Sequence, residues 1–139
     1  MYHYWNPFNK ILKKNRQKNI YAYDFDGVTS IGVTPRNQND IIITGRCIDE
    51  KEYVLGFLKE HGIQCKVYFN PMTLAERGNH TLKARRYSGN HKAKTLSLLK
   101  EQGVNVVRFF EDDSVQMKCI KEEHPELDVV HIKSDLVEK

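Results

Sequence analysis

The chain has 139 residues, of which 40% are hydrophobic and 29% charged, and its formal net charge is +4. This composition is ordinary for one globular domain, and the length is sufficient to bury a core without disulfides or a structural metal. No apolar run approaches the roughly 18 residues of a membrane span, which excludes a protein with helical spans. The three cysteines are far apart and form no CxxC pair, so they do not have the spacing of zinc ligands.

Residues 1–19 are predicted to be a polar, basic extension ahead of a domain over 20–139. The aromatic residues of this extension precede its basic cluster, and it has no small-residue cleavage site, so it lacks the pattern of a signal peptide. We therefore expect a cytoplasmic protein. The first basic cluster, and a second one between Lys83 and Lys94, favour anionic partners.

The first half of the domain is predicted to contain three strands. Apolar residues alternate over 20–25, and the run IIIT at 41–44 is β-branched throughout. The third strand is QCKVYFN, at 64–70. Such short, nearly continuous apolar runs are typical of buried parallel strands.

A helix is predicted over 49–61, between the second and third strands. It has acidic residues in its first turn and Gly62 just past its end. Its apolar face is expected to hold Tyr53, Leu55, Phe57 and Leu58.

The second half begins with 70–89, which is predicted to be irregular and unusually long for a compact domain, as lids and binding loops often are. A helix over 90–103, a strand over 104–110, a helix over 114–124 and a short strand over 128–132 follow. Alternating strands and helices predict an α/β domain with a mostly parallel five-stranded sheet, in which the first strand is central.

Polar side chains stand where these strands end. Asp24 and Asp26 end the first strand, Thr44 ends the second, and EDD at 111–113 ends the fourth. In open α/β sheets the site forms beyond the carboxyl ends of the strands, so these groups are expected to converge there. Lys92 is predicted to open the helix that leads into the fourth strand, which places it at the same edge.

This set of groups predicts phosphoryl-transfer chemistry. Carboxylates held close together repel unless a cation lies between them, and hard oxygen ligands favour Mg²⁺. One carboxylate can attack phosphorus, and a second can move a proton to the leaving oxygen and from water. A hydroxyl and an ammonium group would hold the phosphoryl oxygens.

Each signal also has a structural explanation when taken alone. A DxDG sequence occurs in ordinary turns, and a lysine such as Lys92 is most often a surface residue. The acids 111–113 can cap the helix that follows them. The order of these signals and their positions at the ends of elements favour the functional interpretation.

The motifs resemble those of the haloacid dehalogenase-like (HAD) phosphohydrolase superfamily, over roughly residues 20–132. DFDGVTS is similar to its first motif, IIITGR to its second, Lys92 to its third and FFEDDS to its fourth. The resemblance implies a Rossmann-like three-layer sandwich and a magnesium-dependent phosphatase.

The resemblance also implies a role for each matching residue. Asp24 is expected to be the nucleophile and a Mg²⁺ ligand, and Asp26 the general acid and base, with its backbone carbonyl on the metal. Thr44 and Lys92 are expected to hold the phosphoryl group, with Gly45 and Arg46 beside the substrate. The metal site is expected to be completed by Asp112 and Asp113.

Two assignments stay open at this stage. Lys94 lies two residues after Lys92, and the motif has room for one lysine. We prefer Lys92 because Leu96 and Leu99 share its helical face. Asp112 and Asp113 can exchange the roles of direct ligand and outer partner.

The spacing of the motifs leaves no room for a cap domain, so we expect a capless protein. An open crevice admits large substrates, and the short arrangement is similar to phosphatase domains of polynucleotide end-repair enzymes. The expected partner is thus a phosphorylated substrate, with a nucleic-acid end or a nucleotide as candidates. A two-component receiver is disfavoured, because Asn70 stands where its phosphoacceptor is required. A non-catalytic module of the same fold stays the alternative, and the oligomeric state is unknown.

Overall fold

The computed structural model describes residues 19–133, and the predicted extension over 1–19 lies outside this range apart from Asn19. Five parallel strands form one sheet in the order β3-β2-β1-β4-β5. They are β1 (Ile20–Tyr23), β2 (Ile41–Cys47), β3 (Lys66–Asn70), β4 (Val106–Glu111) and β5 (Asp128–His131). The α/β class and the parallel sheet with a central first strand are therefore confirmed.

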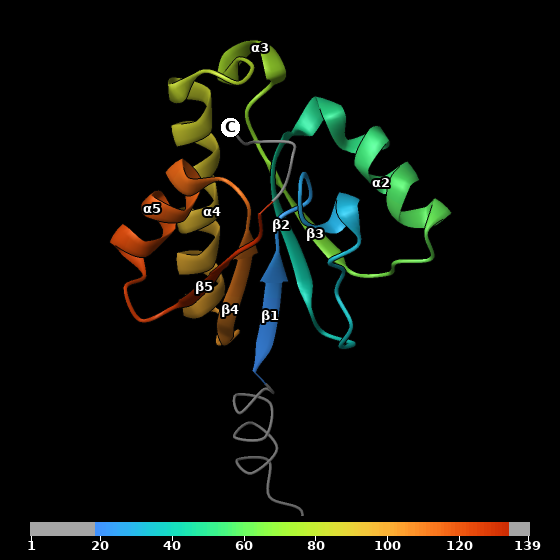
Figure 1. Cartoon of the computed structure of the whole chain (residues 1–139), viewed down its shortest axis with the longest axis vertical. Coiled ribbons are helices and arrows are strands. Elements are labelled where there is room, and N and C mark those ends of the chain that lie inside the picture. Colours follow the sequence, from blue (N-terminus) through green and yellow to red (C-terminus); the bar gives the residue numbers. More distant parts are fainter. Residues whose placement is uncertain (1–18, 134–139) are drawn as a thin grey trace, which may run out of the picture.

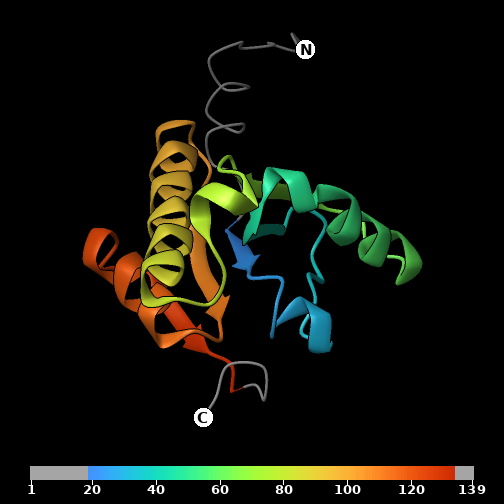
Figure 2. The same cartoon turned by 90° about the horizontal axis from the view of Figure 1, so that it is seen from above.

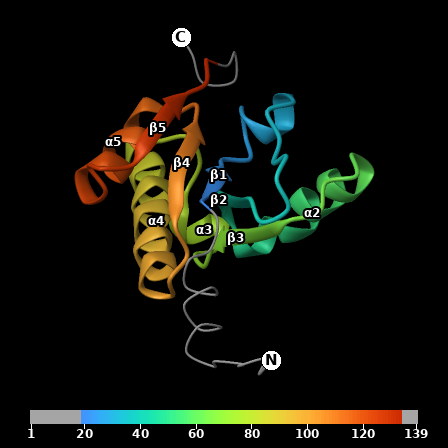
Figure 3. The same cartoon turned by 90° about the horizontal axis from the view of Figure 1, so that it is seen from below.

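Helices cover both faces of the sheet and produce a Rossmann-like three-layer arrangement (Figure 1). α2 (Lys51–Glu60) lies on one face, and α4 (Leu82–Glu101) and α5 (Ser114–Glu123) lie on the other (Figure 3). Successive side chains of β2 pack on opposite faces of the sheet. Ile41 and Ile43 belong to the core beneath α4 and α5, whereas Ile42 belongs to the core beneath α2. Burial of both faces explains the continuous apolar run.

The segment predicted to be irregular over 70–89 is largely helical, which corrects the prediction. It contains the short helix α3 (Leu74–Arg77) and the first turns of α4, which begins at Leu82. Thr81 caps α4, because its side chain accepts the N–H of Ala84. Gly89 lies inside α4, and the position requires glycine because α5 packs closely against it. A Cβ there would come 2.8 Å from the Cys119 side chain and 3.0 Å from the Gln116 Cα on α5. The glycine marks a close helix contact, not a break.

Two further local predictions are corrected. Lys92 lies in the middle of α4 and does not open it. On α2 the buried residues are Val54 and Leu58, whereas Tyr53 and Leu55 are exposed. The four residues predicted for one apolar face are spread over the six positions 53–58, which is more than one side of a helix can present. The observed i, i+4 stripe of Val54 and Leu58 is narrower.

The carboxyl ends of the strands lie beneath α3. Viewed from that side, α3 lies between α4 and α2 (Figure 2). β2 extends past Thr44 to Cys47, and its register against β3 is irregular between Ile43 and Cys47. Among residues 19–133, no helix combines the length and the apolar character that a membrane crossing requires.

Candidate active site

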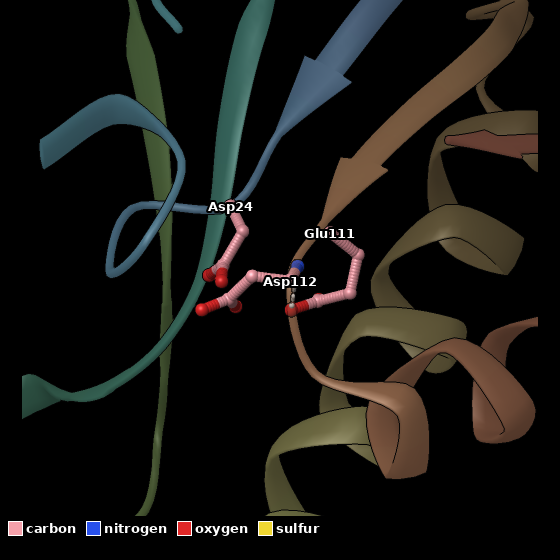
Figure 4. Close-up of side chains that lie close together, drawn as sticks. All are labelled: Asp24, Glu111 and Asp112. Carbon is pink, nitrogen blue, oxygen red and sulfur yellow. Dashed lines mark hydrogen bonds between the residues drawn. The ribbon is translucent and has the colours of Figure 1, made fainter. Parts of the chain in front are cut away.

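Three carboxylates meet where β1 and β4 end. The Asp24 N–H donates to the Phe110 carbonyl at 2.9 Å, which extends the β1–β4 ladder by one residue and holds Asp24 beside the end of β4. Carboxylate oxygens of Asp24, Glu111 and Asp112 lie within 4.8 Å of one another, and Figure 4 shows these side chains converging. The predicted convergence of the first and fourth strand ends is thus present.

Lys92 reaches this cluster from α4. Its Nζ donates to Asp24 Oδ1 at 2.9 Å and to Glu111 Oε1 at 2.6 Å, and the side chain is fully buried. Burial alone would lower the pKa of Lys92, but the two carboxylates outweigh it and the pKa is raised. Lys94 is exposed on the outer side of the same helix. Lys92 is therefore the lysine at the strand ends, and Leu96 and Leu99 are buried on its face as expected.

Glu111 was seen in the sequence only as one of the acids at the end of the fourth strand. Its Oε1 accepts from Lys92, and its Oε2 accepts the backbone N–H groups of Asp112 and Asp113 at 3.1 and 3.2 Å. Both oxygens are occupied, so Glu111 positions the lysine and the following turn. The signal for this role was an acid at the last position of a buried strand, directly before Asp112.

Asp112 is the clustered carboxylate with a buried oxygen that lacks a hydrogen-bond partner among the described residues. The side chain is 6% exposed, and this oxygen is its Oδ2. Burial, together with the charge of Asp24, raises the pKa of Asp112 to about 7. Burial and Glu111 likewise raise the pKa of Asp24 well above its ordinary value.

Buried carboxylates with raised pKa values and an unpartnered oxygen fit a divalent cation, because a cation would favour their ionised forms and supply the missing partner. Asp24 accepts hydrogen bonds from Lys92 and from the Phe25 N–H, both on Oδ1, which leaves Oδ2 for other contacts. The side chains that would hold the ion are those of Asp24 and Asp112.

Asp113 has a different environment. Its carboxylate receives Arg85 Nη2 at 2.6 Å and Arg85 Nε at 3.0 Å, and it caps α5 by accepting the Val115 N–H. Burial acts to raise the pKa of Asp113, but the hydrogen bonds, first that of Arg85, hold it below its ordinary value. Asp113 is not one of the three clustered carboxylates.

Asp26 is also outside the cluster, because it pairs with Arg46. Arg46 Nε and Nη2 donate to its two carboxylate oxygens, both at 2.8 Å. The third donor of Arg46, Nη1, reaches Glu50 at 2.7 Å. These hydrogen bonds, first those to Asp26, raise the pKa of Arg46 above its ordinary value.

Thr44 and Gly45 follow one another in β2 but have different surroundings. Thr44 is fully buried, and its hydroxyl accepts the Arg46 N–H at 3.0 Å, which leaves the hydroxyl hydrogen free to donate. Gly45 packs against α4, where a Cβ would lie 2.5 Å from Ser88 Oγ. A larger residue at position 45 would therefore displace Ser88, which lies one turn before Lys92.

A cavity of about 570 Å³ opens over these groups. Its walls contain Asp24, Asp26, Gly45, Arg46, Lys92, Asp112 and Asp113, which are most of the residues predicted from the sequence. Thr44 is buried behind this surface. The structure adds Arg77, Ser88 and Asn79 among others.

The cavity has a fixed rim on the side of α3. Arg77 Nη1 donates to the Gly45 carbonyl at 2.6 Å, and its Nε donates to the Gly78 carbonyl at 2.9 Å. Asp49 accepts the Leu74 N–H at the start of α3. Sequence patterns could not reveal this rim, because it depends on contacts between segments about thirty residues apart.

No protein-family model, no curated protein and no solved structure matches the chain. The functional argument therefore depends on the geometry of the site.

Proposed function

We propose that the protein is a magnesium-dependent phosphatase of the HAD type, which hydrolyses a phosphomonoester through an aspartyl-phosphate on Asp24. The observation that carries this proposal is the buried Lys92 bridging Asp24 and Glu111, beside the unpartnered oxygen of Asp112. A buried lysine fixed to a carboxylate at an open cavity is suited to neutralising phosphoryl oxygens while that carboxylate attacks phosphorus.

The chain's own residues divide the work as follows. The Asp24 carboxylate, oriented by the hydrogen bonds of Lys92 and the Phe25 N–H to its Oδ1, attacks phosphorus. The Lys92 ammonium holds the phosphoryl oxygens, and Thr44, buried behind the cavity wall, positions the end of β2 by accepting the Arg46 N–H. Asp26 gives a proton to the leaving oxygen and then takes one from the water that hydrolyses the acyl phosphate. When bound by Asp24 and Asp112, Mg²⁺ supplies positive charge that offsets the charge developing on the phosphoryl group.

The proposed substrate class is inferred from the positive charge on the cavity walls. The cavity has no cap domain within the described residues, and its walls carry Arg46, Arg77 and Arg85. Arginine forks bind phosphate oxygens well, so a nucleotide or a phosphorylated nucleic-acid end is the proposed substrate.

The decisive experiment compares wild type with Asp24→Asn in a screen of phosphomonoesters with Mg²⁺. The substitution keeps the shape and removes the nucleophile, so activity should fall by about three orders of magnitude or more. Glu60→Gln, an exposed substitution on α2, serves as the matched control and should keep full activity. Equal rates for wild type and Asp24→Asn would exclude the mechanism, and no hydrolysis of any ester would favour a non-catalytic module.

A further inference from the structure

Arg46 and Asp26, which both line the cavity, are paired with each other. The guanidinium donates two hydrogen bonds of 2.8 Å to Asp26 and a third, of 2.7 Å, to Glu50. The same guanidinium lies 4.8 Å from the centre of the Tyr53 ring. Three of the five N–H donors of the guanidinium, including both prongs of its Nε–Nη2 edge, are thus used by the protein itself.

This pairing is incompatible with the proposed role of Asp26 as the donor of a proton to the leaving oxygen. Both carboxylate oxygens face the arginine, so neither is directed toward a leaving oxygen in the cavity. Arg46, in turn, keeps one N–H on each of Nη1 and Nη2, but its two-pronged Nε–Nη2 edge is not available to a substrate. For either residue to act on a substrate, their pairing has to be exchanged for another one.

The pair is suited to such an exchange. The Asp26 side chain is 45% exposed and the Arg46 side chain 27% exposed, and ion pairs this open to water contribute little net stability. A phosphate group accepts the same two-pronged hydrogen bond, and a phosphomonoester carries up to two negative charges where a carboxylate carries one. A phosphate in the cavity is therefore a strong competitor for the fork.

We propose that Arg46 forms a second anion subsite, and that a second phosphate on the leaving-group side of the substrate takes the arginine fork and releases Asp26. The inference rests on the proposed function. It places the second phosphate on the leaving-group side because that is where Asp26 is needed. Arg77 lies on the same wall, 3.8 Å from Glu50, and adds positive charge there.

The substrate class that fits is a phosphomonoester with a neighbouring phosphate. The neighbour can be a second monoester, as in a nucleoside 3′,5′-bisphosphate, or a diester, as in a dinucleotide with a terminal phosphate. A nucleoside monophosphate has the scissile group alone. If Arg46 instead only positions Asp26, its loss would slow all three compounds by the same factor.

The experiment measures kcat/KM for these three compounds with Mg²⁺. In wild type, a second phosphate is expected to raise kcat/KM at least tenfold over the monophosphate. In Arg46→Gln, Asp26 is always free and the fork is absent, so the ratio is expected to fall below twofold. Arg86→Gln, an exposed substitution on α4, removes the same charge away from the cavity and should keep the wild-type ratio. The bisphosphate and the dinucleotide distinguish a monoester neighbour from a diester one.

Binding to the full chain carrying Asp24→Asn supplies a readout that needs no turnover. Calorimetry should show at least tenfold tighter binding of the bisphosphate or the dinucleotide than of the monophosphate, and Arg46→Gln should remove this difference. That result would support the subsite even if no hydrolysis were found. Asp24-dependent hydrolysis with a ratio unchanged by Arg46→Gln would overturn the subsite and leave the proposed function standing. If the protein neither bound nor hydrolysed any of the three compounds, both the subsite and the proposed function would be overturned.

Discussion

Lys92 is a fully buried cation whose two partners are buried carboxylates. Breaking a buried pair by removing one member is costly because it leaves an uncompensated charge, whereas exposed lysines contribute little. The lysine therefore matters to the fold as well as to the proposed chemistry.

Replacing this lysine should reveal that role. Without metal, Lys92→Met is expected to lower the free energy of unfolding by about 3–5 kcal/mol, because Asp24 and Glu111 lose their counter-charge. Lys94→Met, on the exposed side of the same helix, should stay within about 0.5 kcal/mol of wild type. Urea unfolding of both variants is the measurement, and equal stabilities would contradict the assignment of Lys92 to the buried cluster.

A second residue-scale prediction concerns His91. Burial, with the charges of Lys92 and Lys94, lowers its pKa to about 4. The unfolded chain therefore binds the proton first as pH falls, so stability is lost from about pH 6.5 downward to about pH 4. At pH 5 the loss attributable to His91 is about 2 kcal/mol.

The variant His91→Gln cannot titrate, so it serves as the reference. From pH 7 to pH 5, the free energy of unfolding of wild type should fall by about 2 kcal/mol relative to that of His91→Gln. Taking the difference at each pH cancels the contribution of the buried carboxylates, whose raised pKa values act in the opposite direction. A difference that does not change with pH would show that His91 titrates normally.

At the scale of elements, the meeting of α4 and α5 is the contact most sensitive to a single methyl group. Gly→Ala in a helix usually stabilises by up to about 1 kcal/mol. At Gly89, however, the new Cβ would lie 3.0 Å from the backbone of α5, so Gly89→Ala is expected to destabilise by about 1–3 kcal/mol. Gly56→Ala on α2, where a Cβ meets nothing within 4 Å, should be neutral or stabilising. Thermal unfolding of the two variants gives the sign, and stabilisation by both would show that the helices are farther apart.

Most of the secondary-structure elements could be predicted from the sequence, and one boundary could not. The strands and most of the helices could be predicted because both faces of the sheet are buried, so apolar runs mark strands directly. The beginning of α4 could not, because Gly89 and the basic residues around it resemble a loop until α5 is known to pack there. Lys92 could be preferred over Lys94 from helical spacing, since Leu96 and Leu99 define the buried side.

The pairings at the site were beyond sequence reasoning. Asp112 and Asp113 are adjacent and chemically identical, and their environments differ because Arg85 of α4 and the first turn of α5 donate hydrogen bonds to Asp113. Arg46 and Asp26 stand twenty residues apart with no periodic relation. Such contacts depend on the tertiary structure.

For the molecule as a whole, the carboxylate cluster links stability to metal. A ligand present at 100 times its dissociation constant stabilises the folded state by about 2.7 kcal/mol. We therefore expect millimolar Mg²⁺ to raise the unfolding midpoint, chelation to reverse this, and Asp112→Asn to remove most of the effect. Glu60→Gln should respond as wild type does. Scanning calorimetry is the measurement, and an identical midpoint with and without Mg²⁺ would contradict a metal site at Asp24 and Asp112.

The central position of β1 has a consequence for synthesis of the chain. Asp24 is held by a hydrogen bond to Phe110, so the first motif acquires its geometry only when β4 pairs with β1. A nascent chain that ends before β4 contains DFDG and TGR but exposes an unpaired edge of an apolar strand, which invites association with other chains. C-terminal truncations that remove β4 should therefore accumulate as aggregates rather than as weakly active fragments.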